Sequence, residues 1–375
     1  MFHSNCLLHC LSSMTFISET SHISDNEAAY LYAVELVSLS IPSMALMVAF
    51  ELDLLEIMKK AGPEGIMTAT EAASHLTSTN PDVPVMLDRI LRLLASYSIV
   101  TCRLKTSTDG KVERQYGLAP VCKYLTRDEE GVSQGAIGLF LQSKISIQTW
   151  YSLKDTILEG GSTWKKAHRE TMFELYSKNP KQDAIFNKAM HDNTKMVVEK
   201  LLENYNGFNN ITSLVDVGGG HGIALKMIVS KHPHIKGINF DQPHVIARAT
   251  DIPGVEHVGG DMFVRVPTAD AIFMKGICHD WSDEQSVHVL KNCYNALPEH
   301  GKVIMVECLI PELPENNLES KTIFMLDTLM MAQTEGGKER TEKEWKELAC
   351  KAGFQTVKVA CNVYYFRAIE MIKGL

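Results

Sequence analysis

The sequence contains no pair of cysteines in a Cys-x-x-Cys spacing, and its nine cysteines are an odd number. A disulfide framework would need an even set and a zinc cluster would need close pairs, so neither is indicated. Unpaired thiols suit a reducing environment, and we therefore expect a cytoplasmic protein.

Long apolar runs are also missing. No run reaches the roughly 18 residues that a membrane span needs, so we expect no membrane partner. The start of the chain, MFHSNCLLHCLSSMTF, has no Lys or Arg before its short apolar stretch, and a secretory signal is not favoured. Met14 is an alternative natural start, and the role of residues 1–24, an N-terminal extension, stays open.

An excess of positive charge is absent as well. The 37 Lys and Arg residues are outnumbered by 45 Asp and Glu residues, which gives a net charge of −8. Nucleic-acid binders usually carry a basic patch, so we expect no nucleic-acid partner. With 45% hydrophobic and 22% charged residues over 375 positions, the composition is that of an ordinary globular protein of one or two domains.

Residues 27–60 form an almost uniformly apolar stretch, which Pro42 divides into two predicted helices. A helix that is apolar all round must be covered on every side. Near the start of a chain a second copy of the protein is a natural cover, so we expect a homodimer. Burial within the monomer is the alternative.

Residues 68–118 predict a helix, a second helix and a hairpin with its turn at Asp109, an order typical of a winged helix. The second helix offers only two arginines, Arg89 and Arg92, beside one acid, which is more typical of a solvated face than of a DNA contact. We expect residues 25–125 to form a helical, winged-helix-like dimerisation domain. A non-enzymatic winged-helix regulator that binds a small ligand is one alternative function.

Residues 126–375 differ in texture and predict a second domain. Residues 126–210 read as mostly helical. From residue 211 onward the short β-rich runs SLVDVG, IKGINFD, VEHVGGD, ADAIFMKG and KVIMVE alternate with helical stretches. This alternation predicts an α/β, Rossmann-like core over residues 211–375, with a parallel sheet and crossover helices. Two late runs, QTVKVACN and VYYFRAIEMI, are candidates for an edge hairpin.

The sharpest motif is LVDVGGGHG, which follows a predicted strand and opens a helix. Glycines at such a position let a ligand approach the backbone closely. The glycines stand at Gly218, Gly220 and Gly222, whereas a dinucleotide fingerprint would need its third glycine at Ile223. The loop therefore favours a nucleoside ligand other than NAD, and an NAD-dependent reductase is kept as an alternative function.

Acidic residues end the next two predicted strands. Asp241 follows GINF, where an acid can accept hydrogen bonds from both ribose hydroxyls of an adenosine. Asp261 follows the third strand, where it can accept from an adenine amine while Met262 packs on the ring face. Helix or turn capping is the alternative for both acids. Asp216, just before the glycine loop, favours a cationic ligand end such as the amino group of S-adenosylmethionine (SAM).

Three further polar residues are predicted at the same sheet edge. His279 follows the fourth strand, and histidine is the side chain best suited to take a proton near neutral pH. Glu307 ends the fifth strand, and Glu339 lies in a polar turn before a helix. Considered singly, a structural histidine, a polar strand end and a surface charge are the alternatives.

The segments LVDVGGGHG, GINFDQPHVI, GVEHVGGDMF, CHDWSDEQ, VECLIPE and GGKERTEKEW resemble, in order and spacing, those of plant phenolic O-methyltransferases of the caffeic acid type. The resemblance covers roughly residues 25–375. It implies a SAM-dependent, metal-independent enzyme that methylates a phenolic hydroxyl. It also implies a homodimer built through the N-terminal domain and a substrate-pocket segment over residues 126–210.

Carried over residue by residue, the resemblance places the catalytic base at His279 and its two flanking acids at Glu307 and Glu339. It places the cofactor contacts at Gly218, Asp241, Asp261, Met262 and Lys275. One departure is His221, which stands in the glycine loop where family members often have threonine. Its effect on the cofactor stays open.

The resemblance places the acceptor pocket at Phe186, Met190, Asn193, Leu329, Met330 and Thr334. Asn193 lies where lignin-pathway members tend to have histidine, so the acceptor and its hydroxyl stay open among phenylpropanoids, lignans, flavonoids and alkaloids. Methionines suit aromatic ligands, and Met325 and Met331 are further candidates for the wall. Burial on a helix face is the alternative for these two.

The expected reaction is direct transfer of a methyl group from the sulfonium of SAM to a phenolic oxygen. A phenol has a pKa of about 10 and is mostly protonated at neutral pH. His279 would remove its proton, while Glu307 and Glu339 would hold the ring and favour its charged form. No metal is expected, because the sequence has no HExxH motif and no cysteine cluster.

Overall fold

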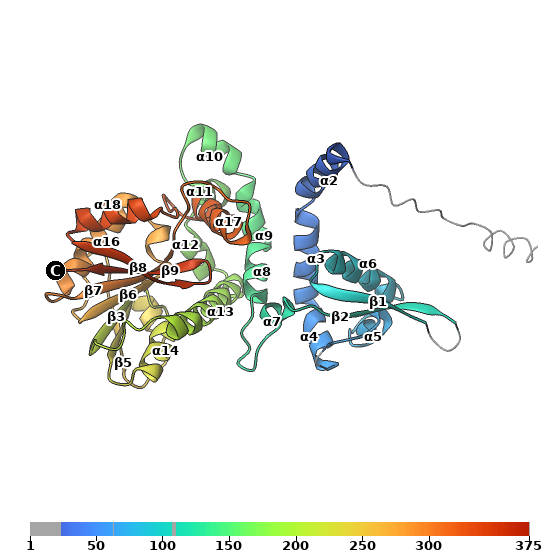
Figure 1. The fold of residues 1–375 in the computed structure, drawn as a ribbon, viewed down its shortest axis with the longest axis horizontal. Coiled ribbons are helices and arrows are strands. Elements are labelled where there is room, and N and C mark those ends of the chain that lie inside the picture. Colours follow the sequence, from blue (N-terminus) through green and yellow to red (C-terminus); the bar gives the residue numbers. More distant parts are fainter. Residues whose placement is uncertain (1–23, 63, 107–109, 375) are drawn as a thin grey trace, which may run out of the picture.

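The computed structural model describes residues 24–62, 64–106 and 110–374. The chain forms an N-terminal part and a larger C-terminal part that lie side by side (Figure 1). The alternative start at Met14, nearly all of the extension over residues 1–24, and Asp109 of the expected hairpin turn lie outside the described residues.

The N-terminal part shows the expected order of helix, helix and hairpin. Its elements are α2 (Asp25–Val37), α3 (Ser40–Glu51), α4 (Leu54–Lys60), α5 (Ala69–Ser74), α6 (Val83–Ser96), β1 (Val100–Thr106), β2 (Val112–Leu118) and α7 (Cys122–Leu125). The strands β1 and β2 pair antiparallel. Leu87, Leu91 and Leu94 recur at helical spacing on α6 and are buried in the core of this part.

The apolar stretch over residues 27–60 forms parts of three helices rather than the two expected. The first break lies at Ser38 and Leu39, before Pro42. Pro42 therefore stands in the first turn of α3, where its missing N–H removes no helical hydrogen bond. A second break follows at Asp53, whose φ of 50° is left-handed and stops the helix.

The helix α2 has no buried residue in the single chain that the structure describes. Tyr30 and Val37 are 69% and 84% exposed. Burial within the monomer, the alternative for this segment, is therefore wrong for α2. Of the helices in the described residues, none alone is long and apolar enough to span a membrane; α2 and α3 meet that test only as a pair, bent by 48°.

Six helices precede the sheet of the C-terminal part, as the sequence predicts for residues 126–210. They are α8 (Gly135–Leu141), α9 (Lys144–Trp150), α10 (Leu153–Glu159), α11 (Thr163–His168), α12 (Met172–Ser177) and α13 (Pro180–Asn204). Phe140, Trp164 and Tyr176 are buried together in a small aromatic core, against which Phe186 of α13 packs.

The seven-stranded sheet has the order β5-β4-β3-β6-β7-β9-β8. Its elements and crossovers are β3 (Ser213–Val217), α14 (Ile223–Lys231), β4 (Lys236–Asp241), α15 (Pro243–Ile246), β5 (Val255–Gly259), β6 (Ala271–Lys275), η1 (Cys278–Asp280), α16 (Asp283–Ala296), β7 (Lys302–Cys308), α17 (Leu318–Gln333), α18 (Glu342–Ala352), β8 (Thr356–Val363) and β9 (Phe366–Ile372). The predicted parallel strands and the predicted edge hairpin are both confirmed.

Helices cover both faces of this sheet (Figure 1). One face packs against α13, α14 and α17, and the other packs against α16 and α18. Because β3, β4, β6 and β7 run parallel, their carboxyl ends meet at one edge. That edge brings the glycine loop, Asp241, Lys275 and Glu307 together.

Candidate active site

A cavity of about 1450 Å³ opens at the carboxyl edge of the sheet, between the strand ends and α8, α12, α13 and α17. All residues predicted to contact cofactor or acceptor line it: Gly218, Asp241, Asp261, Met262, Lys275, Phe186, Met190, Asn193, Leu329, Met330 and Thr334. His279 lines it too. Glu307 and Glu339 lie behind His279, and their side chains are fully buried.

The glycine loop folds back on the end of β4. The N–H of Gly220 donates to Oδ2 of Asp241 at 2.8 Å, so this acid also fixes the loop. Gly218 has a φ of 71°, and a Cβ there would lie 2.4 Å from Cδ1 of Ile277. A Cβ on Gly220 would meet no atom within 4 Å, so that side of the loop faces open space. A ligand can therefore lie directly against the backbone.

Asp216 at the end of β3 is a buried acid with an unsatisfied oxygen. The residue is 2% exposed and lines the cavity, and its Oδ2 has no hydrogen-bond partner among the described residues. Burial raises the pKa of Asp216 to about 8, the charge of Asp241 adds to this, and Lys275 opposes it. A buried carboxylate oxygen needs a donor, and an ammonium group would supply one. These residues therefore fit the amino end of SAM.

The adenosine positions predicted from the sequence lie on the same wall. Asp261 accepts the N–H of Phe263 through Oδ1 at 2.9 Å, which is the capping role considered for it. Its other carboxylate oxygen is not used in that bond. Phe263 packs edge-on against Trp281 with ring centroids 4.9 Å apart. Both rings line the cavity beside Met262 and supply an apolar slot for a flat base.

Lys275 at the end of β6 joins two walls of the cavity. Its Nζ donates to Oδ1 of Asn193 on α13 at 3.2 Å and lies 5.5 Å from the ring centroid of Phe366. Burial lowers the pKa of Lys275 to about 8, although the charges of Glu307, Cys308 and Asp216 oppose this. An acidic ligand group near Nζ would restore the charged form.

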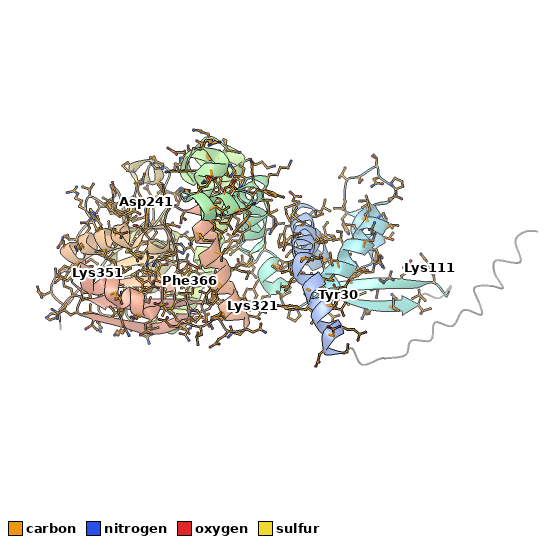
Figure 2. All side chains as sticks on the ribbon, turned by 90° about the horizontal axis from the view of Figure 1, so that it is seen from above. Tyr30, Lys111, Asp241, Lys321, Lys351 and Phe366 are labelled. Atoms are coloured by element: carbon orange, nitrogen blue, oxygen red, sulfur yellow. The ribbon has the colours of Figure 1, made fainter. Side chains whose placement is uncertain are left out.

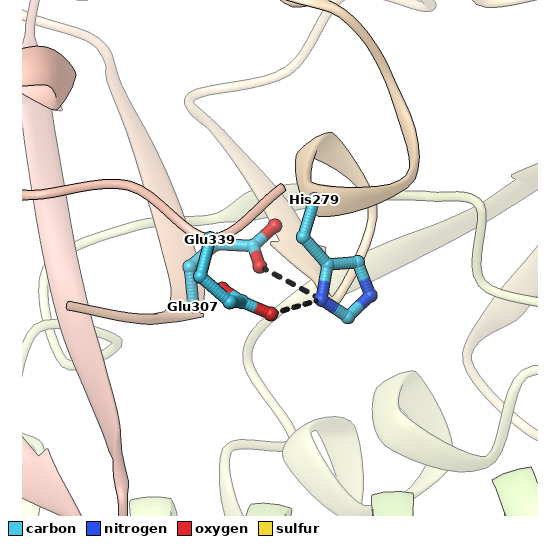
Figure 3. Close-up of side chains that lie close together, drawn as sticks. All are labelled: His279, Glu307 and Glu339. Atoms are coloured by element: carbon cyan, nitrogen blue, oxygen red, sulfur yellow. Dashed lines mark hydrogen bonds and ion pairs between the residues drawn. The ribbon is translucent and has the colours of Figure 1, made fainter. Parts of the chain in front are cut away.

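His279 on η1 is held by a carboxylate on each of two other segments. Its Nδ1 donates to Oε1 of Glu339 at 2.7 Å and lies 4.0 Å from Oε2 of Glu307 (Figure 3). Glu307 is fixed in turn, because its Oε1 accepts the N–H groups of Ile277 and Cys278, each at 3.0 Å. The ring nitrogen Nε2 points away from both carboxylates (Figure 3). It lies 3.8 Å from Oδ1 of Asp280.

Acidic neighbours set the charge of this histidine. Burial alone would lower the pKa of His279, but the charges of Asp280 and Glu307 and the hydrogen bond to Glu339 outweigh it and raise the pKa to about 10. Burial also raises the pKa of Glu307. These neighbours therefore favour the imidazolium form of His279 at neutral pH.

One nitrogen of His279 and one oxygen each of Glu307 and Glu339 lie within 4.8 Å of one another, a spacing that could hold a metal ion. Histidine and carboxylate are common ligands of divalent cations. In the structure Nδ1 of His279 and Oε1 of Glu339 are already at a hydrogen-bond distance of 2.7 Å. The arrangement observed is thus a carboxylate–imidazole pair.

The two further methionine candidates have different outcomes. Met325 and Met331 are 65% and 44% exposed, so the alternative of burial on a helix face is wrong for both. Met325 lines the cavity, whereas Met331 is not among its lining residues.

Sequence reasoning missed several lining residues. Phe263 directly follows Met262 and Trp281 stands two residues after His279, so their closeness in sequence to these predicted residues was the available signal. Tyr365 and Phe366 enter the cavity from the turn between β8 and β9. No motif marks them, because only the antiparallel addition of β9 beside β7 brings this turn to the site.

Comparisons with known proteins agree with this geometry. The family model described as an O-methyltransferase domain matches residues 150–355, and the one described as an O-methyltransferase dimerisation domain matches residues 34–128. Caffeic acid 3-O-methyltransferase 1 of Populus kitakamiensis is 56% identical over 94% of this chain and 96% of its own length. The caffeic acid 3-O-methyltransferase of Medicago sativa is 54% identical over the same shares of the two chains.

Solved structures show the same fold. Human N-acetylserotonin methyltransferase in complex with SAM superposes with a TM-score of 0.76 at 20% identity, over 96% of this chain and 100% of that one. An NAD-dependent reductase, the alternative function, is not supported by these matches. The chain has the fold of class I SAM methyltransferases with an N-terminal dimerisation domain, and it belongs to the O-methyltransferase family.

Proposed function

We propose that this O-methyltransferase transfers the methyl group of SAM to a phenolic hydroxyl of a plant aromatic secondary metabolite. The relatives named as caffeic acid 3-O-methyltransferases support a phenolic acceptor. The observation that carries the proposal is the hydrogen bond between Glu339 and Nδ1 of His279, beside a cavity lined by aromatic and methionine side chains. This pair leaves one imidazole nitrogen for the substrate.

SAM supplies, when bound, a methyl group on a positively charged sulfur, and that charge favours the neutral form of a nearby imidazole. The unpaired oxygen of Asp216 would accept from its amino group. Asp241 would bind the ribose and Asp261 the adenine, with Met262 against the ring. Gly218 lets the backbone of the glycine loop lie close to SAM. Lys275 would face the carboxylate of SAM.

His279 acts as the general base in this proposal. Its Nε2 takes the phenolic proton, while Nδ1 keeps its own proton and donates it in the hydrogen bond to Glu339. The acidic neighbours raise the pKa of His279 and so bring its basicity closer to that of a phenolate, while the charge of the sulfur keeps the ring able to accept the proton. Glu307 stabilises the charged product through its buried carboxylate.

Replacing His279 tests this role. We expect His279→Gln to lower kcat by about 10² to 10⁴-fold while SAM still binds at least as tightly as to the wild type, because no imidazolium then opposes its sulfur. His75→Gln, an exposed histidine of the N-terminal part, is the matched control. Turnover of His279→Gln close to that of the wild type would remove the base assignment.

In this proposal the acceptor lies against Phe186, Met190, Leu329 and Met330, with Asn193 and Thr334 as polar groups; all six residues line the cavity. Screening a panel of phenylpropanoids, lignans, flavonoids and alkaloids with labelled SAM would identify it. We expect Asn193→His, which removes the carbonyl that Lys275 uses, to change the ratio of kcat/KM between two accepted phenols by about tenfold. Met331→Leu, outside the cavity lining, should leave that ratio unchanged.

We propose that the reaction needs no metal ion, because Nδ1 of His279 is committed to Glu339. Activity should persist after dialysis against excess chelator. Activity that is lost on chelation and restored by Mg²⁺ would instead favour a metal-assisted route.

The same proposal includes the domain boundaries: a dimerisation domain over residues 25–125 and a second domain over residues 126–375, with its pocket segment 126–210. It also includes a cytoplasmic location. Unpaired thiols support a reducing compartment: the cysteines that the structure describes, such as Cys278, Cys293 and Cys308, are free. A fluorescent fusion of the protein that accumulates in the secretory pathway would contradict the cytoplasmic location. Limited proteolysis would test the boundary between the two domains, where we expect cleavage near residue 126.

A further inference from the structure

Arg340 is a fully buried arginine next to the active site, with 0% exposure. It follows Glu339 directly in the segment before α18. A guanidinium has five N–H donors in a fixed planar fork and stays charged. Five hydrogen bonds use them here, to Oδ1 of Asp283 (2.9 Å), the carbonyl of Cys278 (2.9 Å), the carbonyl of Trp281 (2.7 Å), Oγ of Ser286 (3.3 Å) and the carbonyl of Lys338 (3.4 Å).

Two of these bonds hold the turn that carries His279. The carbonyls of Cys278 and Trp281 stand on either side of the histidine, one before it and one two residues after it. Both accept from the same guanidinium, so the backbone of η1 is fixed at its two ends. The ring itself is fixed by Glu339. Adjacent residues of one segment thus hold the backbone and the side chain of the same histidine.

The backbone of Arg340 also reaches the third member of the site. The N–H of Ile310 donates to the carbonyl of Arg340 at 3.0 Å, and Leu309 and Arg340 form a parallel bridge. This bridge begins directly after β7, which carries Glu307. The relative positions of His279, Glu307 and Glu339 therefore all depend on where Arg340 lies.

The charge balance of this arginine is unusual. Its one acidic side-chain partner is Asp283, in the first turn of α16, with a side chain 41% exposed. Its remaining partners are neutral, three of them backbone carbonyls. The ring of Trp345 lies 5.2 Å from the guanidinium carbon. A lysine would carry the same charge but has only three donors on one atom, so it cannot bridge carbonyls at both ends of η1.

We infer that Arg340 is a positioning residue for methyl transfer: it holds the turn over residues 278–281 so that Nδ1 of His279 stays on Glu339 and Nε2 faces the cavity. The inference rests on the proposed function of His279 as the base. Arg340 is not among the residues lining the cavity, and it acts through the histidine.

The test compares Arg340→Lys and Asp283→Asn with the wild type. A displacement of about 1 Å at a reacting group can cost about 10²-fold in rate. We therefore expect Arg340→Lys to lower kcat by about that factor, with the acceptor KM within about threefold of wild type and SAM binding no weaker than in the wild type. Asp283→Asn removes one exposed anchor and should lower kcat less. Lys346→Met, which removes an exposed charge on α18 that pairs with Glu342, is the control and should keep its kcat.

A second readout separates positioning from loss of folding. If the turn shifts, His279 moves away from Glu339, and the pKa that its acidic neighbours raise must fall. We expect the acidic limb of the pH–kcat profile to move to lower pH in both Arg340→Lys and Asp283→Asn. Merely partial unfolding would lower kcat without moving that limb. Unchanged kcat, or lowered kcat with an unmoved limb in both variants, would overturn the inference.

NMR titration of ¹³C-labelled histidine, assigned with His279→Gln, makes the result independent of turnover. A lower pKa of His279 in Arg340→Lys supports positioning even if no phenol is methylated, in which case only the proposed function fails. An unchanged titration in a folded Arg340→Lys protein rejects positioning and leaves the proposed function standing.

Discussion

The carboxylate of Glu339 lies 2.7 Å from Nδ1 of His279, and the two residues are 60 positions apart in the chain. This bond fixes which ring nitrogen is protonated and directs the other away from the carboxylates (Figure 3). A neutral amide in place of the carboxylate would keep the geometry and lose the charge.

We therefore expect Glu339→Gln to lower kcat by about 10 to 100-fold, because the imidazolium formed in the reaction loses a charged partner. Its SAM affinity should not fall, since Glu339 does not line the cavity and a less basic His279 opposes the sulfur less. Glu335→Gln, an exposed acid of the same segment that pairs with Lys165, serves as the control for steady-state kinetics. Equal kcat in the two variants would contradict the role of Glu339.

Binding of SAM should release a proton from His279. The free protein holds this imidazole charged, with a pKa of about 10, because Asp280, Glu307 and Glu339 outweigh its burial. A positive sulfur nearby disfavours that charge and lowers the pKa, so the proton leaves and SAM affinity rises with pH below about 10. Calorimetry at pH 8 in two buffers of different ionisation enthalpy measures the proton count.

S-adenosylhomocysteine, whose sulfur is neutral, is the comparison ligand for this count. Asp216 and Lys275 also titrate near pH 8, but both ligands present them with the same amino-acid end. The difference between the two ligands therefore isolates the sulfur. We expect more protons released with SAM, and no difference in His279→Gln. Equal release in the wild type would argue against a base that faces the sulfur.

Asp241 has two tasks, since it accepts the N–H of Gly220 and faces the cavity. We expect Asp241→Ala to raise the dissociation constant for SAM by about 10 to 100-fold, the range expected when a hydrogen bond to a charged group is lost. Asp251→Ala, an exposed acid on the connection between β4 and β5, should leave it unchanged. Wild-type affinity in Asp241→Ala, measured by calorimetry, would remove the ribose role.

The exposed apolar face of α2 predicts a specific effect on assembly. Val37 is 84% exposed in the single chain, on the domain that matches the O-methyltransferase dimerisation family. A lysine there would place a charge in the interface, and we expect the dimer dissociation constant to rise at least about tenfold. Val264→Lys alters a valine 73% exposed on the C-terminal part and is the control for light scattering. Dimers of equal stability would place the interface elsewhere.

The parallel strands were predictable because each is a short apolar run that ends in a glycine, an acid or a lysine. Asp241 and Lys275, the last residues of β4 and β6, combine a local pattern with a topological rule, namely that carboxyl ends of parallel strands share one edge. The resemblance in the sequence then supplied the roles of His279, Glu307 and Glu339, which periodicity alone leaves open.

Other features depend on contacts that no local pattern records. Tyr365 reaches the cavity only because β9 joins the sheet antiparallel beside β7. Arg340 reads from the sequence as one more charge in a polar turn, yet its guanidinium is fully buried. The helix break at Ser38 and Leu39 precedes Pro42, since proline is tolerated in a first helical turn. Tertiary packing decides the first two cases, whereas the third follows from the local tolerance of a first helical turn for proline.

The hydrogen bond from Lys275 to Asn193 has a thermodynamic consequence. Lys275 ends β6 on the wall of the cavity that would bind SAM, and Asn193 lies on α13 on the wall that would bind the acceptor. An acceptor that binds the side-chain carbonyl of Asn193 would release Lys275 from this hydrogen bond. Lys275 could then bind the carboxylate of SAM more tightly. Because the coupling between two binding sites is reciprocal, bound SAM would raise the affinity for that acceptor by the same factor.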